Sequence, residues 1–183
     1  MIRVTEVLNY FKEPWYVDWV CRVGKREANR VSKAAMKIGT RVDELIKSNG
    51  TPSSKDKPEV QCAMNAYAKW LHVYKPTLIV NGTRHDTTIE GQEVSGEPDL
   101  FVDGVLVDIK CSSKISPLYW VQVNMYSYLT NHLGRVGILR LDKTTASYEY
   151  VVKDYDKSLV DVWLGLMRAM VYLKGDGDGT VDV

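Results

Sequence analysis

The run GEPDLFVDGVLVDIK, residues 96–110, contains two short β-rich segments on either side of an Asp-Gly pair. An Asp-Gly pair between apolar, β-rich segments is a strong signal for a β-hairpin. In such a hairpin Asp99, near the start of one strand, comes close to Asp108, near the end of the other. Strand side chains alternate between faces, so Asp108 and Lys110 point the same way while Ile109 points into the core. Two carboxylates and an ammonium group therefore converge at one end of a sheet, as a hard divalent cation and a phosphate require.

A helix is predicted directly after this hairpin and its short polar loop. Ser116 and Pro117 are typical N-cap and first-turn residues, and the helix should run to about residue 131. Tyr119, Gln122 and Tyr126 then lie on one helix face. An amide and a phenol so aligned can orient a water molecule or bind the substrate backbone. The alternative is that they are half-exposed polar residues on a packed helix.

These motifs together resemble a family. Pro-Asp at 98–99, Asp-x-Lys at 108–110 and Gln-x-x-x-Tyr at 122–126 are similar to the signature of the PD-(D/E)XK nucleases, in the RecB-like and phage-type exonuclease branch. The resemblance implies a restriction-endonuclease-like core, in which a central mixed β-sheet is flanked by helices. The α/β order of the predicted elements, with a helical N-terminal segment, agrees with that core.

The resemblance also implies a role for each residue of the hairpin. Asp99, Asp108 and the backbone carbonyl of Ile109 would hold one or two Mg²⁺ or Mn²⁺ ions. Lys110 would steady the attacking water or the negative charge that develops on the phosphate. The amide and the phenol of the following helix would hold water or phosphate in line. These are the predicted catalytic groups.

Two further acidic contributions are left open. Residues 39–43, Gly-Thr-Arg-Val-Asp, resemble the Gly-Thr-x-x-His segment of the RecB-like exonucleases, but Asp43 stands at the His position. A carboxylate there is a suitable ligand for Mg²⁺ or Mn²⁺, and the alternative is an exposed helical Asp. Many relatives also carry a Glu ahead of the Gly-x-x-Asp segment. Glu90, Glu93 and Glu97 are candidates, and the sequence does not choose among them.

Residues 25–48 predict a long amphipathic helix ended by Asn49-Gly50. Its apolar stripe uses Ala28, Val31, Ala35, Ile38, Val42 and Leu45. A basic stripe, with one further residue just before it, consists of Arg22, Arg26, Arg30, Lys33, Lys37 and Arg41. An ordinary solvated face mixes both signs of charge, so this one-signed stripe is a candidate DNA-binding surface. Additional predicted DNA contacts are Ser112, Lys114 and Tyr119, the first two in what is otherwise an ordinary strand-to-helix loop.

The remaining elements are predicted from periodicity and turn signals. A short helix begins at the N-cap Thr5 and reaches Phe11, and a second spans 14–23 with Trp15, Tyr16 and Trp19 mostly in the core. The alternative for these aromatics is stacking on a substrate base. Further helices are predicted at 59–74 and 154–173, and strands at 77–80, 87–94, 136–141 and 147–152.

Length and composition suit one globular domain. The 183 residues carry a formal net charge of +1, so any basic surface must be local. We expect a helical part at 1–75, the sheet with the active site at 76–152, a C-terminal helix at 153–174 and a flexible tail at 175–183. No apolar run approaches the roughly 18 residues of a membrane span, and the first residues do not form a signal peptide.

Three scattered cysteines suit a reducing cytoplasm, of a bacterium or of a phage-infected host, and are too few for a four-thiolate iron–sulfur cluster. The expected function is that of a metal-dependent DNA exonuclease in recombination, repair or replication. Its partners would be DNA with an end, single- or double-stranded, and recombination or replication proteins. A structure- or site-specific endonuclease and a catalytically silent DNA-binding relative are the alternatives.

Overall fold

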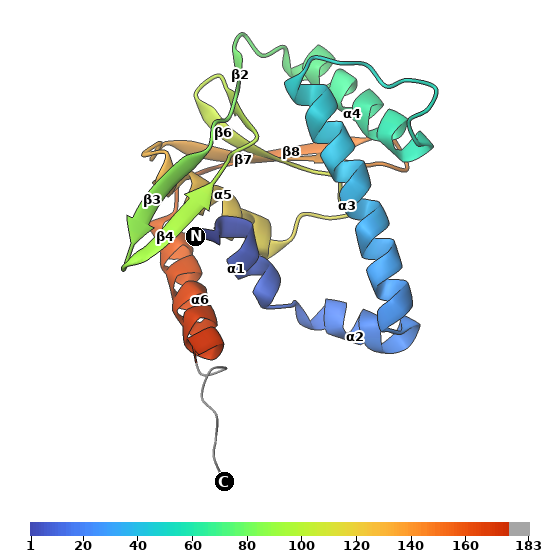
Figure 1. Cartoon of the computed structure of the whole chain (residues 1–183). Helices are drawn as coiled ribbons and strands as arrows, with labels where there is room; N and C mark the ends of the chain where they lie inside the picture. The colour runs from blue at the N-terminus through green and yellow to red at the C-terminus, as the bar shows by residue number, and fades with distance from the viewer. Residues whose placement is uncertain (176–183) are drawn as a thin grey trace.

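The computed structural model describes residues 1–175, which form a five-stranded mixed sheet between two layers of helices, with a smaller sheet beside it (Figure 1). The elements, in chain order, are β1 (Ile2–Arg3), α1 (Val4–Tyr10), α2 (Pro14–Val23), α3 (Lys25–Lys47), α4 (Pro58–Tyr74), β2 (Ile79–Asn81), β3 (His85–Ile89), β4 (Gln92–Gly96), β5 (Leu100–Val102), β6 (Val105–Lys110), α5 (Pro117–Leu129), β7 (Arg135–Leu141), β8 (Tyr148–Asp154) and α6 (Lys157–Gly175). The predicted fold class is confirmed.

The five-stranded sheet has the order β2-β5-β6-β7-β8 and is built on the predicted hairpin. Leu100 pairs with Val107 across the antiparallel strands β5 and β6, and the turn between them places Asp103 at φ 49° and Gly104 at φ 78°. Positive φ at both positions is the type I′ geometry that an Asp-Gly pair favours. Strand β6 then pairs in parallel with β7, and α5 forms the crossover between them.

Alternation along β6 separates two hydrophobic cores. Val105 and Val107 pack, with α3 and α4, on one face of the sheet, and Ile109 packs against the edge of that core. Leu106 packs on the other face with α1, α5 and α6. Asp108 and Lys110 share the face of Leu106, so they point towards α5. The alternation of side chains along β6 therefore places Asp108 and Lys110 against α5 rather than against α3 and α4.

The smaller sheet corrects one prediction. Residues 87–94 do not form a single strand: they turn at Glu90-Gly91, with φ of 50° and 76°, to make the antiparallel hairpin β3–β4. The Glu-Gly pair is a weaker turn signal than Asn-Gly, and the β-favouring residues Thr87 and Thr88 before it and Val94 after it suggested one continuous strand. Strand β1 adds in parallel to β4, which gives the order β1-β4-β3.

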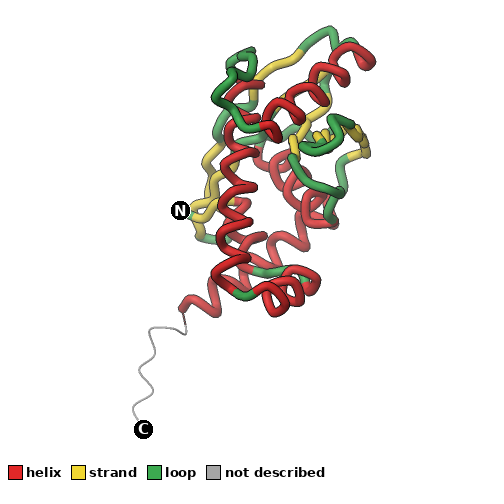
Figure 2. The backbone as a smooth tube through the Cα atoms, turned by 90° about the vertical axis from the view of Figure 1, so that its right-hand side faces the viewer, coloured by secondary structure: helices red, strands yellow, loops and turns green. Residues whose placement is uncertain are grey.

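The N-terminal helices differ from the prediction in two respects. Helix α1 begins at Val4 with Arg3 as N-cap, so Thr5 is not the cap. Helix α2 spans the predicted residues, but none of them is buried, and Trp15 is 50% exposed. The cause is position, because α2 lies at the lower end of α3, away from the sheet, and the strands lie above this helical end (Figures 1 and 2).

Helix α3 ends as predicted, since Asn49 adopts φ 50° and the Gly50 amide donates to the Leu45 carbonyl. Its predicted apolar stripe is buried only in part, and Val31, near the α2 end, is exposed. The predicted flexible tail lies, after Gly175, outside the described residues. Within residues 1–175 no helix is long and apolar enough to cross a membrane.

Candidate active site

Asp99 and Asp108 meet at one end of the five-stranded sheet, as the hairpin predicts. Asp99 comes directly before β5 and Asp108 lies in the second half of β6. Asp99 Oδ2 accepts a 2.6 Å hydrogen bond from the backbone N–H of Ile109. The backbone oxygen of Asp99 in turn accepts a 2.9 Å hydrogen bond from Gly82. Both the side chain and the backbone of Asp99 are therefore held by neighbouring strand segments.

Asp108 is the most enclosed member of the cluster, with 1% of its surface exposed. Its Oδ2 lies 2.7 Å from the Lys110 ammonium, and its Oδ1 accepts a 3.1 Å hydrogen bond from the Gln122 amide. The same amide nitrogen lies 3.1 Å from the Tyr126 hydroxyl. Gln122 and Tyr126 are both buried, so they are not the half-exposed polar residues of the alternative interpretation. The two motifs form one hydrogen-bonded cluster.

Burial dominates the electrostatics of this cluster. It raises the pKa of Asp99 to about 7, with a further contribution from the like charge of Asp108, and it also raises the pKa of Asp108. Burial opposes the charge on Lys110, but Asp108 and Asp99 outweigh it and the net effect raises the Lys110 pKa. Burial likewise raises the pKa of Tyr126, so its phenol stays protonated. Burial thus disfavours the ionised forms of both carboxylates, and additional positive charge at the site would stabilise them.

Asp43 lies beside this cluster, because its charge acts on both Asp99 and Asp108. Its Oδ2 is 3.2 Å from the Lys47 ammonium, whereas its Oδ1 is buried and has no hydrogen-bond partner among the described residues. Lys47 also lies 3.0 Å from Oε1 of Glu97. Lys47 therefore bridges a helix carboxylate and a carboxylate on the segment that leads to Asp99.

Of the three glutamates left open, Glu97 alone lies at the cluster. Glu90 is ion-paired with Arg168 of α6, and Glu93 is exposed on β4 opposite Thr88. The hairpin β3–β4 accounts for this difference, since it carries the first two residues away from the end of β6.

The donor set fits a hard cation in its chemistry, because Asp43, Asp99 and Asp108 offer only carboxylate oxygens. The buried, unpartnered Oδ1 of Asp43 is a further point in favour. In the conformation described, however, no three His, Cys, Asp or Glu side chains of residues 1–175 are grouped closely enough to hold a metal ion. Lys110 and Gln122 instead occupy the oxygens of Asp108.

The basic stripe of α3 is divided by its ion pairs. Arg30 is bound to Glu27, and Arg41 is bound to Asp56 at 2.8 Å and to Glu44 at 3.3 Å. The pairs with Glu27 and Glu44 have the i,i+3 spacing of helix neighbours, whereas the pair with Asp56 could not be read from spacing, because Asp56 lies in the loop before α4. The exposed members of the stripe for which residues 1–175 offer no ion pair are Arg22, Arg26, Lys33 and Lys37.

The side chains of the loop after β6 partly bind other groups of the protein. The Ser112 hydroxyl donates to the Lys114 carbonyl at 2.8 Å. The Lys114 ammonium lies 5.5 Å from the ring centroid of Trp15, and the Lys110 ammonium lies 5.2 Å from that of Tyr119. Tyr119 is thus in contact range of the catalytic candidates, and Lys114 reaches α2.

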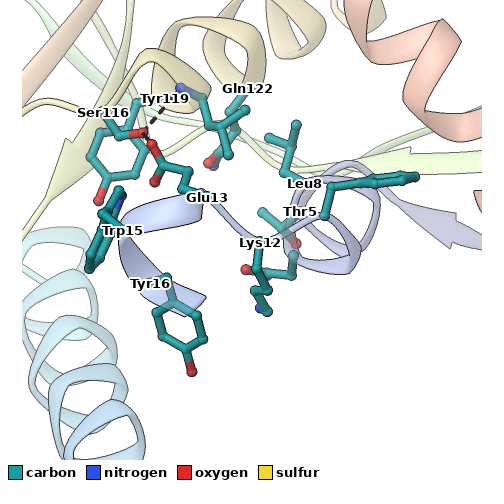
Figure 3. Close-up of a pocket in the computed structure, with 12 residues that line it drawn as sticks. Thr5, Leu8, Lys12, Glu13, Trp15, Tyr16, Ser116, Tyr119 and Gln122 are labelled. Atoms are coloured by element: carbon teal, nitrogen blue, oxygen red, sulfur yellow. Dashed lines mark hydrogen bonds between the residues drawn. The ribbon is translucent and has the colours of Figure 1, made fainter. Parts of the chain in front are cut away.

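Two cavities flank the α5 residues of the cluster. One, of about 230 Å³, lies between α1, α2 and the start of α5, and it includes Gln122 in its wall (Figure 3). The other, of about 300 Å³, lies on the Tyr126 side and carries Arg3 and Arg84. Each cavity thus reaches the cluster through one residue of α5, Gln122 on one side and Tyr126 on the other.

Sequence reasoning missed Lys47 and the cavity wall formed by α1 and α2. The spacing of Asp43 and Lys47, four residues apart on a predicted helix, is a signal that could have found the first. For the cavity wall the only signal was the cluster of aromatics at 15–19, for which stacking on a base was the alternative interpretation, because the wall itself depends on how α2 is placed against α5.

No protein-family model matches the chain, and no curated protein matches it in sequence. Several solved structures do match the chain in three-dimensional structure. A putative exonuclease from Eubacterium rectale aligns with a TM-score of 0.52 and 15% identity over 77% of this chain and 67% of that one. The alkaline exonuclease LHK-Exo from Laribacter hongkongensis aligns with a TM-score of 0.48 and 16% identity, over 96% of this chain and 92% of that one. A phage related exonuclease from Haemophilus somnus 129PT aligns with a TM-score of 0.46 and 13% identity, over 92% of this chain and 90% of that one. The chain therefore shares its fold with the putative exonuclease from Eubacterium rectale.

Proposed function

We propose that this protein is a metal-dependent DNA exonuclease that hydrolyses phosphodiester bonds in recombination, repair or replication. One observation carries the proposal: Asp99, Asp108 and Lys110 converge at the end of a buried hairpin, where a stable fold has no need of them. The cost of burying two carboxylates is a feature of active sites more often than of structural ion pairs.

Asp99 and Asp108, with Asp43 and the Ile109 carbonyl, would hold Mg²⁺ or Mn²⁺. When bound, such an ion supplies charge to the phosphate oxygens and lowers the pKa of water. Lys110 keeps its proton at neutral pH because Asp108 and Asp99 stabilise it, so it is suited to stabilise charge that develops on the phosphate. The protonated phenol of Tyr126 is a hydrogen-bond donor that would orient water or phosphate, and the amide of Gln122 positions this phenol and Asp108 by donating to both.

The basic side chains of α3 that have no ion pair within residues 1–175 would guide the DNA backbone to this cluster. At about 100° per residue, Lys33 and Lys37 project about 80° and about 120° away from Asp43 around the helix. A strand that follows these side chains therefore passes beside the carboxylates rather than over the apolar face. Arg30 and Arg41, which are ion-paired, would contribute less.

The experiment is a nuclease assay on end-labelled linear DNA and on closed circular DNA, with Mg²⁺ or Mn²⁺ and with EDTA. We expect degradation of the linear DNA from its ends, none in EDTA, and none on the closed circle. Cleavage of the circle would identify an endonuclease on the same core. Binding without cleavage of any DNA would identify a catalytically silent relative, and activity in EDTA would overturn the metal-dependent mechanism.

A further inference from the structure

The cavity between α1, α2 and α5 has a size and a wall that suit one flat aromatic group. Its volume of about 230 Å³ is below the range of about 300–1,000 Å³ that drug-sized ligands fill. The wall includes the aromatic residues Phe11, Trp15, Tyr16 and Tyr119. The last three are labelled in Figure 3. These rings come from three segments of the chain, one of which lies about a hundred residues after the other two.

The charges of the cavity favour a base over a phosphate. Glu13 lies in the wall, where its Oε1 accepts a 3.0 Å hydrogen bond from the Ser116 hydroxyl, and its carboxylate repels an anion. The nearby ammonium groups face rings, since Lys12 lies 5.4 Å from the Tyr16 centroid and Lys114 lies 5.5 Å from that of Trp15. An uncharged base with hydrogen-bond donors on its edge meets both the rings and the carboxylate favourably.

The cavity adjoins the proposed catalytic cluster through two residues of α5. Gln122 forms part of its wall and donates to Asp108, and the Tyr119 ring in the same wall faces the Lys110 ammonium at 5.2 Å. A phosphate held at Lys110 therefore places the neighbouring nucleotide of the same strand at this cavity. Because Trp15 is 50% exposed and α2 contains no buried residue, an incoming base can reach its ring, on which the exposed Lys114 ammonium rests, at 5.5 Å.

We propose that this cavity is a base-binding subsite that takes the unpaired base next to the scissile phosphate, with Trp15 as its principal stacking residue. A double helix is far too wide for it, so the substrate at this point is a single strand, either single-stranded DNA or a frayed end. This inference rests on the proposed function, since the cluster of Asp99, Asp108 and Lys110 defines the scissile position.

The test is a binding measurement that does not depend on cleavage. Fluorescence anisotropy in EDTA gives the Kd of the full chain for a labelled single-stranded oligonucleotide and for a series in which one base at a time is replaced by an abasic site. For the unmodified protein we expect one abasic position to weaken binding between about fivefold and about a hundredfold. Trp15→Ala should weaken binding to the intact oligonucleotide by a similar factor and should no longer sense that abasic position.

Trp15→Phe, which keeps an aromatic face, should retain most of the affinity. Tyr172→Ala, at a 69% exposed aromatic residue of α6, is the matched control and should bind as the unmodified protein does. Equal affinities for all abasic oligonucleotides, or an abasic effect that Trp15→Ala leaves intact, would overturn the subsite. If cleavage is absent but the abasic effect depends on Trp15, the nuclease proposal fails and the cavity remains a base-binding site of a DNA-binding protein, with no scissile phosphate beside it. If cleavage occurs without the effect, the reverse holds.

Discussion

The side-chain amide of Gln122 joins the two motifs of the site, because its nitrogen donates to Oδ1 of Asp108 and lies 3.1 Å from the Tyr126 hydroxyl. A residue of α5 thereby fixes the orientation of a carboxylate on β6. The crossover from β6 to β7 brings the helix over the face on which Asp108 lies. The geometry of this cluster therefore follows from the topology of the sheet.

Gln122→Ala should reduce activity by about 10- to 100-fold, the range typical of residues that orient a metal-binding carboxylate. The physical reason is that Asp108 loses the donor that holds its Oδ1. The measurement is the nuclease rate together with the affinity for Mn²⁺, obtained by calorimetry. Asn124→Ala, a buried polar change on the same helix that faces the Trp120 and Asp156 backbone, is the control for stability effects. Unchanged rate and affinity in Gln122→Ala would remove it from the site.

Asp108→Asn should lower activity by at least about a hundredfold while leaving the fold intact. The substitution keeps the shape of the side chain but removes a charge whose burial is unfavourable, as the raised pKa of Asp108 indicates. We therefore expect the thermal midpoint of the metal-free variant to be equal to or above that of the unmodified protein. A folded Asp108→Asn protein with full activity would contradict the proposed role.

The hairpin and the α5 motif could be predicted from sequence because their signals are local. An Asp-Gly turn fixes the register of β5 and β6, and Ser116-Pro117 fixes the start of α5. The alternation of β6 then orients Asp108 and Lys110 without further information. Each of these features depends on residues within one or two turns of each other.

The parts that could not be predicted depend on tertiary placement. Trp15 has the spacing of a core residue, but α2 packs away from the sheet and leaves it exposed. Lys47 binds Glu97, 50 residues later in the chain, and Arg41 binds Asp56 in a loop. Periodicity reports which face of a helix is apolar and does not report which partner the polar face meets.

The metal-free protein should lose stability as pH rises from about 4 towards about 7. The pKa of Asp99 is about 7 in the fold, against an ordinary value near 4, so the folded state binds more protons than the unfolded state in this window. Stability falls wherever that is true, and it levels off above the folded pKa. Denaturant unfolding in EDTA at several pH values measures the slope.

Asp99→Asn supplies the comparison for this pH dependence. It should raise the stability of the metal-free protein at about pH 8 and should have little effect below about pH 4, because the wild-type carboxyl is protonated in both states there. A stability that rises with pH across this window, and does so equally in both proteins, would show that other groups control the slope. The Asp99→Asn variant should also bind Mn²⁺ more weakly at every pH.

Removal of charge from the free cations of α3 should weaken DNA binding in a salt-dependent manner. Lys33→Ala combined with Lys37→Ala should reduce the slope of log Kd against log salt by at most about 1.8, which is about 0.9 for each phosphate that a lysine no longer neutralises. Arg30→Ala should have a smaller effect, since Glu27 already neutralises that guanidinium. Lys157→Ala, at an exposed residue of α6, is the control. An unchanged slope in the double variant would exclude this face from the DNA path.

Gly82→Ala should disrupt the site from a position that carries no functional group. A Cβ at residue 82 would lie 2.7 Å from the Pro98 carbonyl carbon and in contact with its oxygen, so the backbone that carries Asp99 must shift. The same residue donates the 2.9 Å hydrogen bond to the Asp99 carbonyl. We expect a lower thermal midpoint and a loss of activity greater than the loss of folded protein.

Gly165→Ala is the matched substitution for Gly82→Ala. Residue 165 lies within α6, and a Cβ there meets nothing within 4 Å. Alanine has the higher helix propensity, so this variant should gain about 0.5–1 kcal/mol of unfolding free energy and keep full activity. Because the two variants add the same methyl group, a loss of activity confined to Gly82→Ala isolates the approach of residue 82 to Pro98 as its cause. Equal activity in the two proteins would mean that Asp99 tolerates a displaced backbone and that its position is set by the Ile109 amide alone.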